Sequence, residues 1–170
     1  DMVIWIIGLP GSGKTTIGKH LYERVNTSHS NCVFIDGDDI RKIMMNDLGY
    51  SLEDRKINAS RIRNLCKHLD SQNINVICSI LSLFKEDREW NRLNYNEYYE
   101  VYLDVPMAII TQRNQKGLYS SSENKNVVGY DIAFNPPEYP DLTVKNIPEL
   151  TTAKEAAELI FENVKDTFYE

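Results

Sequence analysis

A short apolar run near the start of the chain leads directly into a glycine-rich loop. The run is Val3–Ile7, and the loop, Gly8–Thr15, satisfies the pattern GxxxxGK(S/T) in full. Helical character then continues from Lys14 to Val25. Strand, glycine-rich loop and helix in this order are typical of a phosphate-binding P-loop, so the segment is constrained to one local geometry.

The residue types in this loop are those that phosphate binding requires. Glycines let the backbone curl until successive N–H groups point at phosphate oxygens, and the helix N-terminus adds its partial positive charge. Lys14 would place a charge on the β- and γ-phosphates, while the Thr15 hydroxyl would coordinate Mg²⁺. The sequence therefore predicts that ATP is bound by Gly8, Leu9, Pro10, Gly11, Ser12, Gly13, Lys14, Thr15 and Thr16.

The rest of the chain alternates short apolar runs with amphipathic stretches, which favours an α/β fold with a parallel sheet. Besides Val3–Ile7, we expect strands at Cys32–Ile35, Val76–Leu81, Val101–Leu103 and Thr143–Val144. After the helix that follows the P-loop, we expect helices at Asp38–Met45, Ser51–Ser71, Lys85–Asn94, Pro106–Gln112 and a last one capped by Thr152. That last helix should face inward with Ala157, Ile160, Phe161, Val164 and Phe168.

Length and composition narrow the class of protein. A chain of 170 residues suits a single domain, residues 1–170, and its net charge of −6 argues against binding a nucleic-acid polymer. Three cysteines without paired spacing are typical of a reduced, cytoplasmic protein. No run approaches the roughly 20 apolar residues of a membrane span, and the first run reads as a strand, not a signal peptide.

Carboxylates follow the second expected strand, at Asp36, Asp38 and Asp39. The carboxyl end of a buried parallel strand is where ligands bind in open α/β sheets. A carboxylate there can hold Mg²⁺ or accept a proton from an attacking hydroxyl. We expect Asp36 to do so, together with Lys14 as a catalytic group, whereas Asp38 is equally explained as a helix N-cap or as a catalytic group.

Six segments in a fixed order resemble the adenylylsulfate (APS) kinase family, and they span most of the chain. They are GLPGSGKTT from residue 8, IDGDDIR from 35, DLGYSLEDRKIN from 47, ILSLFKEDR from 80, EVYLD from 100 and RNQKGLY from 113. The resemblance implies a P-loop kinase fold with a five-stranded parallel sheet flanked by helices. It also implies transfer of the γ-phosphoryl of MgATP to the 3′-hydroxyl of a nucleoside 5′-phosphate derivative.

Carried over residue by residue, the resemblance implies an acceptor site and a lid. The lid would cover about residues 113–140, which lack periodicity, with Arg113 and Lys116 reaching ATP. Ser82 falls on a serine that the family is sometimes credited with phosphorylating, and we interpret it as a hydrogen-bonding residue of the pocket. The acceptor would be bound by Asp38, Arg41, Tyr50, Arg55, Asn58, Ser82, Leu83, Lys116, Gly117, Leu118 and Tyr130.

The sequence also departs from the family pattern at the acceptor side. The family's paired acids in the lid are Phe134 and Asn135 here, and Leu83 replaces a proline. Tyr50 and Tyr130 keep an aromatic clamp, which stacks on any base. With these departures the chain resembles the branch of the family that includes cytidine diphosphoramidate kinase of bacterial capsule synthesis. Cytidine diphosphoramidate is therefore the favoured acceptor, and adenylylsulfate is the alternative.

Two other classes of function remain possible from the sequence. A P-loop kinase of another metabolite, such as shikimate or gluconate, would lack the aromatic clamp and the KGLY segment. A non-catalytic nucleotide-binding module would bind ATP without acceptor-dependent release of ADP. A homodimer is common in the family, but the residues themselves do not specify an oligomeric state.

Overall fold

The protein is built around one five-stranded parallel sheet with the strand order β2-β3-β1-β4-β5. The computed structural model describes residues 1–113, 127–129, 131–146 and 151–168. The strands are β1 (Val3–Ile7), β2 (Cys32–Asp36), β3 (Asn75–Ile80), β4 (Tyr98–Asp104) and β5 (Leu142–Lys145). Every strand pair is parallel, as the α/β reading of the sequence predicted.

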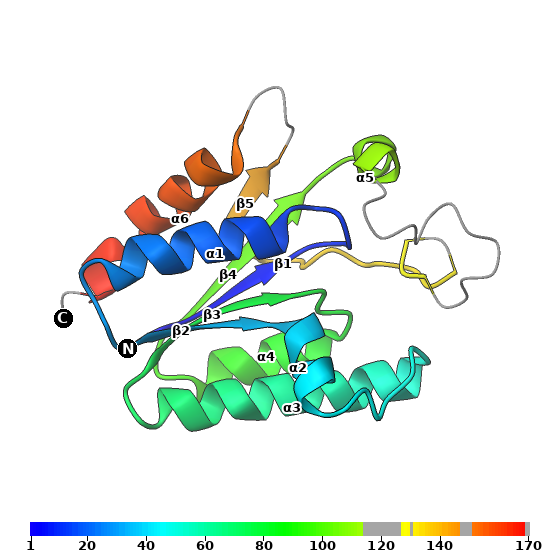
Figure 1. Cartoon of the computed structure of the whole chain (residues 1–170), viewed down its shortest axis with the longest axis horizontal. Coiled ribbons are helices and arrows are strands. Elements are labelled where there is room, and N and C mark those ends of the chain that lie inside the picture. Colours follow the sequence, from blue (N-terminus) through cyan, green and yellow to red (C-terminus); the bar gives the residue numbers. More distant parts are fainter. Residues whose placement is uncertain (114–126, 130, 147–150, 169–170) are drawn as a thin grey trace.

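Helices cover both faces of this sheet (Figure 1). On one face α1 (Lys14–Asn26) lies beside α6 (Ala153–Phe168). On the other face lie α2 (Gly37–Ile43), α3 (Leu52–Asp70) and α4 (Lys85–Asn94). The short α5 (Met107–Arg113) follows β4. None of the helices in the described ranges combines the length and the apolar character that a membrane crossing needs.

The apolar patterns of the sequence explain how these layers pack. Both β1 and β3 are buried along their whole length, as expected of central strands covered on two faces. The inward stripe predicted for α6 is buried as well, which includes Ile160, Phe161 and Val164. Both predicted caps are present, because the Thr152 hydroxyl accepts the Glu155 N–H and the Ser51 hydroxyl accepts the Asp54 N–H.

Two predicted elements, α2 and β4, have different bounds in the structure. The helix expected from Asp38 begins at Gly37, because Asp36 is its N-cap and accepts the Asp38 N–H at 2.8 Å. It ends at Ile43, since Met45 and Asn46 adopt left-handed backbone angles with φ of 60° and 50°. The fourth strand is longer than Val101–Leu103, because pairing with β1 starts at Tyr98.

Parallel strands place all their carboxyl ends at one edge of the sheet, where ligands bind in folds of this kind. The P-loop follows β1 at that edge, and Asp36 is the last residue of β2. Ser82 follows β3, and Asn146 follows β5. Residues that are more than a hundred positions apart in the chain are therefore neighbours around the P-loop.

Gly18 allows α1 to approach the sheet, which gives a prediction about stability. A Cβ added at Gly18 would lie 2.6 Å from Phe34 Cε2 and would also collide with the Ser79 hydroxyl. Gly18→Ala should therefore destabilise the fold by about 2 kcal/mol in urea titrations. Gly37→Ala is the control, because its Cβ would meet nothing closer than 3.5 Å. A Gly18→Ala variant as stable as Gly37→Ala would contradict this close approach.

Candidate active site

The P-loop has the backbone shape that its glycines predict. Gly11 and Gly13 take positive φ angles of 85° and 93°, which residues with a Cβ rarely adopt. Gly13 is the N-cap residue of α1, and no side chain of the described residues caps this helix. A helix N-terminus without a side-chain cap is suited to an anion, which agrees with a phosphate-binding loop.

Side chains from three distant elements bind the outer carbonyls of this loop. Arg113 Nη1 at the end of α5 donates to Gly11 O at 2.8 Å. Asn146 Nδ2 donates to Ser12 O at 2.7 Å, and Ser79 Oγ on β3 donates to Lys14 O at 2.6 Å. The P-loop is thus held from the end of α5, from the residue after β5 and from β3. Arg113, which was expected to reach ATP, contacts the loop itself.

Asp36 lies directly against the P-loop helix. Thr15 Oγ1 donates a hydrogen bond to Asp36 Oδ2 at 2.5 Å, while Asp36 Oδ1 caps α2. Asp36 is only 8% exposed, so both oxygens are fixed. The structure thereby brings together the hydroxyl and the carboxylate that the sequence predicted as metal ligands. Asp38 lies two residues further on, in the first turn of α2, and lines the same cavity.

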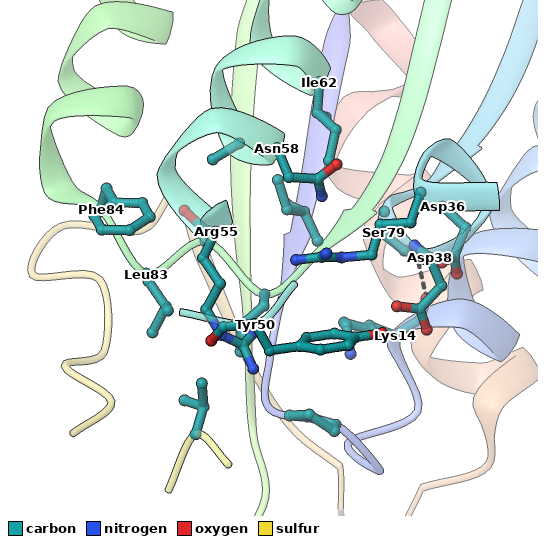
Figure 2. Close-up of a pocket in the computed structure, with 18 of the residues that line it drawn as sticks. Lys14, Asp36, Asp38, Tyr50, Arg55, Asn58, Ile62, Ser79, Leu83 and Phe84 are labelled. Atoms are coloured by element: carbon teal, nitrogen blue, oxygen red, sulfur yellow. Dashed lines mark hydrogen bonds between the residues drawn. The ribbon is translucent and has the colours of Figure 1, made fainter. Parts of the chain in front are cut away.

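A cavity of about 500 Å³ extends from this pair along α2 and the start of α3 (Figure 2). One end contains Lys14, Asp36 and Asp38. The remaining predicted acceptor residues that the structure describes all line it: Arg41, Tyr50, Arg55, Asn58, Ser82 and Leu83. The cavity therefore joins the phosphate loop to the predicted acceptor site.

Two arginines gather around Tyr50 inside this cavity. Arg41 Nη1 donates to Gly49 O at 2.9 Å, and Arg55 Nε donates to Tyr50 O at 3.0 Å. The guanidinium carbons lie 4.4 Å and 5.2 Å from the centre of the Tyr50 ring. Burial and the nearby charge of Arg41 lower the pKa of Arg55 below its usual value. Two close cations in a partly buried pocket favour an anionic ligand.

Two further groups on the cavity wall are buried and polar. Asn58 is 7% exposed, and its Oδ1 has no hydrogen-bond partner among the residues that the structure describes. Ser82 has a positive φ of 53°, and Arg88 Nη1 donates to its carbonyl oxygen at 2.8 Å and to its hydroxyl at 3.3 Å. Arg88 thus holds a strained residue in place at the cavity wall.

Some residues that the sequence analysis singled out are not described by the structure or do not line this cavity. Lys116, Gly117, Leu118 and Tyr130 lie outside the described residues. The structure therefore describes only part of the predicted lid, namely residues 113, 127–129 and 131–140, and does not describe the second half of the aromatic clamp. Phe134 packs on Tyr102, with ring centres 6.2 Å apart, and neither Phe134 nor Asn135 is among the residues lining this cavity. The resemblance places this pair in a motif that borders the acceptor pocket, and that placement stays a prediction.

The structure also adds residues that sequence reasoning missed. Ser79 and Phe84 line the cavity, as do Lys42 and Asn46. Val127 and Val128 line it too, and they lie within the predicted lid. Arg88 belongs to one of the six motifs, which was the only available signal for it. Asn146 stands in no motif, so nothing local in the sequence marks its contact with the P-loop.

A parallel sheet with a P-loop, an acidic residue beside the loop and a nucleotide-sized cavity next to it define a P-loop phosphotransferase. The family model for adenylylsulphate kinase matches residues 1–145. The chain therefore belongs to the adenylylsulfate kinase family and is an ATP-dependent phosphotransferase with a hydroxyl acceptor. This confirms the resemblance, the fold class and the enzyme class that the sequence predicted.

Relatives with two different acceptors in their names match this chain. The chain is 41% identical to a cytidine diphosphoramidate kinase of Campylobacter jejuni over 85% of both chains. It is 38% identical to an adenylyl-sulfate kinase of Thermodesulfovibrio yellowstonii, over 98% of this chain and 84% of that one. Among solved structures, the Mycobacterium tuberculosis APS kinase in complex with AMPPNP and APS superimposes with a TM-score of 0.87 and 25% identity, covering 96% of this chain and 97% of that chain.

Proposed function

We propose that this enzyme transfers the γ-phosphoryl of ATP to the ribose 3′-hydroxyl of cytidine diphosphoramidate. The observation that carries the proposal is the single cavity that joins Lys14 and Asp36 to the Arg41–Arg55 pair. A phosphoryl donor and a nucleotide acceptor would then meet at the Asp36 end. In such reactions catalysis is mainly positioning and charge stabilisation, and the cavity supplies both.

At the donor end, the backbone N–H groups from Gly8 to Thr16 would cradle the phosphates and Lys14 would stabilise the γ-phosphoryl. Arg113 would act through the loop carbonyl that it binds. Mg²⁺ fits the oxygen donors of Thr15 and Asp36, because this ion usually takes one or two protein oxygens and completes its shell with phosphates and water. When bound, the ion would neutralise charge between the β- and γ-phosphates.

Asp36 is our candidate for orienting the attacking 3′-hydroxyl, with Asp38 as the second carboxylate at that end of the cavity. An ionised carboxylate accepts a hydrogen bond from the hydroxyl and can take its proton as the new P–O bond forms. The leaving ADP oxygen is then stabilised by Lys14. Ser82, with its hydroxyl held by Arg88, would hydrogen-bond the acceptor at the far wall.

Charge and hydrogen bonding support an extended anionic nucleotide at the acceptor end. Arg41 and Arg55 suit a diphosphate, and the Tyr50 ring beside them suits a stacked base. The unpartnered Asn58 Oδ1 needs a donor, which a ribose hydroxyl or a phosphoramidate nitrogen supplies. Leu83 lies on the same wall. The similarity to the Campylobacter jejuni enzyme supports cytidine diphosphoramidate, and thus capsule synthesis, over adenylylsulfate.

The proposal extends to the setting of the reaction. We expect a single kinase domain that works in the cytoplasm, where ATP and nucleotide acceptors are found, with a small-molecule acceptor as its partner. A homodimer stays a prediction. Lys116, Gly117, Leu118 and Tyr130 stay predicted ATP or acceptor contacts outside the described residues.

An acceptor panel tests this proposal. With MgATP held constant, kcat/KM for ADP release should be at least ten-fold higher with cytidine diphosphoramidate than with adenylylsulfate, because a site built for one polar group rejects an analogue that leaves it unpaired. CDP is the matched control, since it carries an oxygen where cytidine diphosphoramidate carries its terminal nitrogen. A preference for adenylylsulfate would assign the enzyme to sulfate activation. ATP binding without acceptor-dependent ADP release would indicate a binding module.

A further inference from the structure

Asn146 lies against the P-loop although it belongs to a distant part of the chain. It follows β5 directly, and its own N–H donates to Asp104 O at 3.3 Å, which continues the pairing with β4. The side chain is 5% exposed and donates from Nδ2 to Ser12 O at 2.7 Å. A Cβ added at Gly13 would lie 2.7 Å from the same nitrogen. The carboxamide is thus packed on the Ser12–Gly13 peptide.

Binding that carbonyl fixes the direction of the neighbouring N–H. The described chain contains no cis peptide bond, and in a planar trans peptide the C=O and N–H groups point in opposite directions. With Ser12 O held outward by Asn146, the Gly13 N–H points inward, toward the concave side of the loop. Gly13 has φ of 93° and few conformational restrictions of its own, so an external contact is needed to fix this peptide.

The Gly13 N–H differs from its neighbour in the loop. The Ser12 N–H donates within the loop, to Leu9 O at 3.0 Å. No acceptor is found for the Gly13 N–H within residues 1–113, 127–129, 131–146 and 151–168. A buried or semi-buried backbone donor without a protein partner at a helix N-terminus is suited to a phosphate oxygen.

We propose that Asn146 is a positioning residue for ATP, which orients the Ser12–Gly13 peptide so that the Gly13 N–H binds a phosphate. This rests on the proposed function in one respect, namely that the loop binds ATP phosphates. Asn146 does not touch the nucleotide in this account. Its effect on the reaction passes through one peptide group.

The test uses nuclear magnetic resonance of the full chain with Mg²⁺ and ADP as the probe. Ser12–Gly13 is the only serine–glycine dipeptide in the sequence, so carbonyl-¹³C serine combined with ¹⁵N glycine singles out the Gly13 amide. In the wild type, ADP should move this amide proton downfield, as expected when a donor binds a charged oxygen. In Asn146→Ala, the shift at saturating ADP should be at most half as large, and ADP should bind about ten-fold more weakly.

Asn163→Ala is the matched control, because this exposed asparagine on α6 also donates its Nδ2 to a backbone carbonyl, that of Leu159. It should behave as the wild type. Asn146→Asp keeps the side chain's shape but loses the donor when ionised, and it should reproduce the Asn146→Ala result if the alanine variant does not fold.

The outcomes separate the two proposals. A folded Asn146 variant with the full wild-type shift and affinity would overturn the role of Asn146. If the chemical shift of the wild-type Gly13 amide proton does not change and ADP does not bind, ATP binding by this loop would instead be overturned.

Discussion

Lys14→Ala should lower kcat by about a thousand-fold while leaving the protein folded. Lys14 is the first residue of α1 and reaches the cavity where the donor and acceptor ends meet. Phosphoryl transfer gains most of its rate from charges placed on the transferring group, and one such preorganised group typically contributes a factor of 10² to 10³. The Lys14 side chain is only partly buried, so its removal creates no large cavity in the core.

Lys19→Ala is the matched control, because Lys19 lies on the same helix but is exposed. It should keep wild-type kcat. Circular dichroism and the urea midpoint of both variants would establish that the fold is intact. Near-normal turnover by a folded Lys14→Ala variant would show that the loop is not the donor site. A loss shared by Lys19→Ala would point to damage of α1 instead.

Elements whose cause is local were predictable from the sequence. The apolar run Val3–Ile7, the glycine pattern of the P-loop and the caps at Ser51 and Thr152 act within a few residues. The α6 stripe follows from helical spacing alone. The errors at the ends of α2 are also local, but they depend on which of two nearby acids is the cap and on left-handed angles at Met45 and Asn46.

Contacts between residues that the strand order brings together could not be predicted from the sequence. The sequence favours five parallel strands but does not state the order β2-β3-β1-β4-β5. That order brings Asn146 onto Ser12, 134 positions away in the chain. The packing of Phe134 on Tyr102 of β4 is a second contact that the sequence alone does not predict.

Arg88 was only partly predictable from the sequence. Its motif was visible, but its role depends on the positive φ of Ser82, which a sequence does not reveal. The guanidinium binds the carbonyl oxygen and the hydroxyl of that one residue, and Arg88 is itself only 8% exposed. A structural residue in a motif can therefore shape an acceptor wall without any expected contact with the acceptor.

Asp36→Asn should lower kcat by about a hundred-fold or more, with little change in stability. Asparagine is as good an N-cap as aspartate, so its amide oxygen can still accept the Asp38 N–H and keep α2 in place. Its amide nitrogen can donate to Thr15 Oγ1 and preserve the contact, but the direction of that hydrogen bond is reversed. What is lost is the negative charge, which both Mg²⁺ binding and general-base catalysis require.

Asp38→Asn separates the two carboxylates, because Asp38 lines the same cavity in the first turn of α2 without capping it. Rates measured over a series of Mg²⁺ concentrations show whether the loss of activity in Asp36→Asn comes from the ion or from the 3′-hydroxyl. If Asp36 acts mainly through the ion, excess Mg²⁺ should recover part of the Asp36→Asn rate; if it acts mainly on the 3′-hydroxyl, no ion concentration should do so. A silent Asp36→Asn beside an inactive Asp38→Asn would exchange the two roles and leave Asp36 as a cap that orients Thr15.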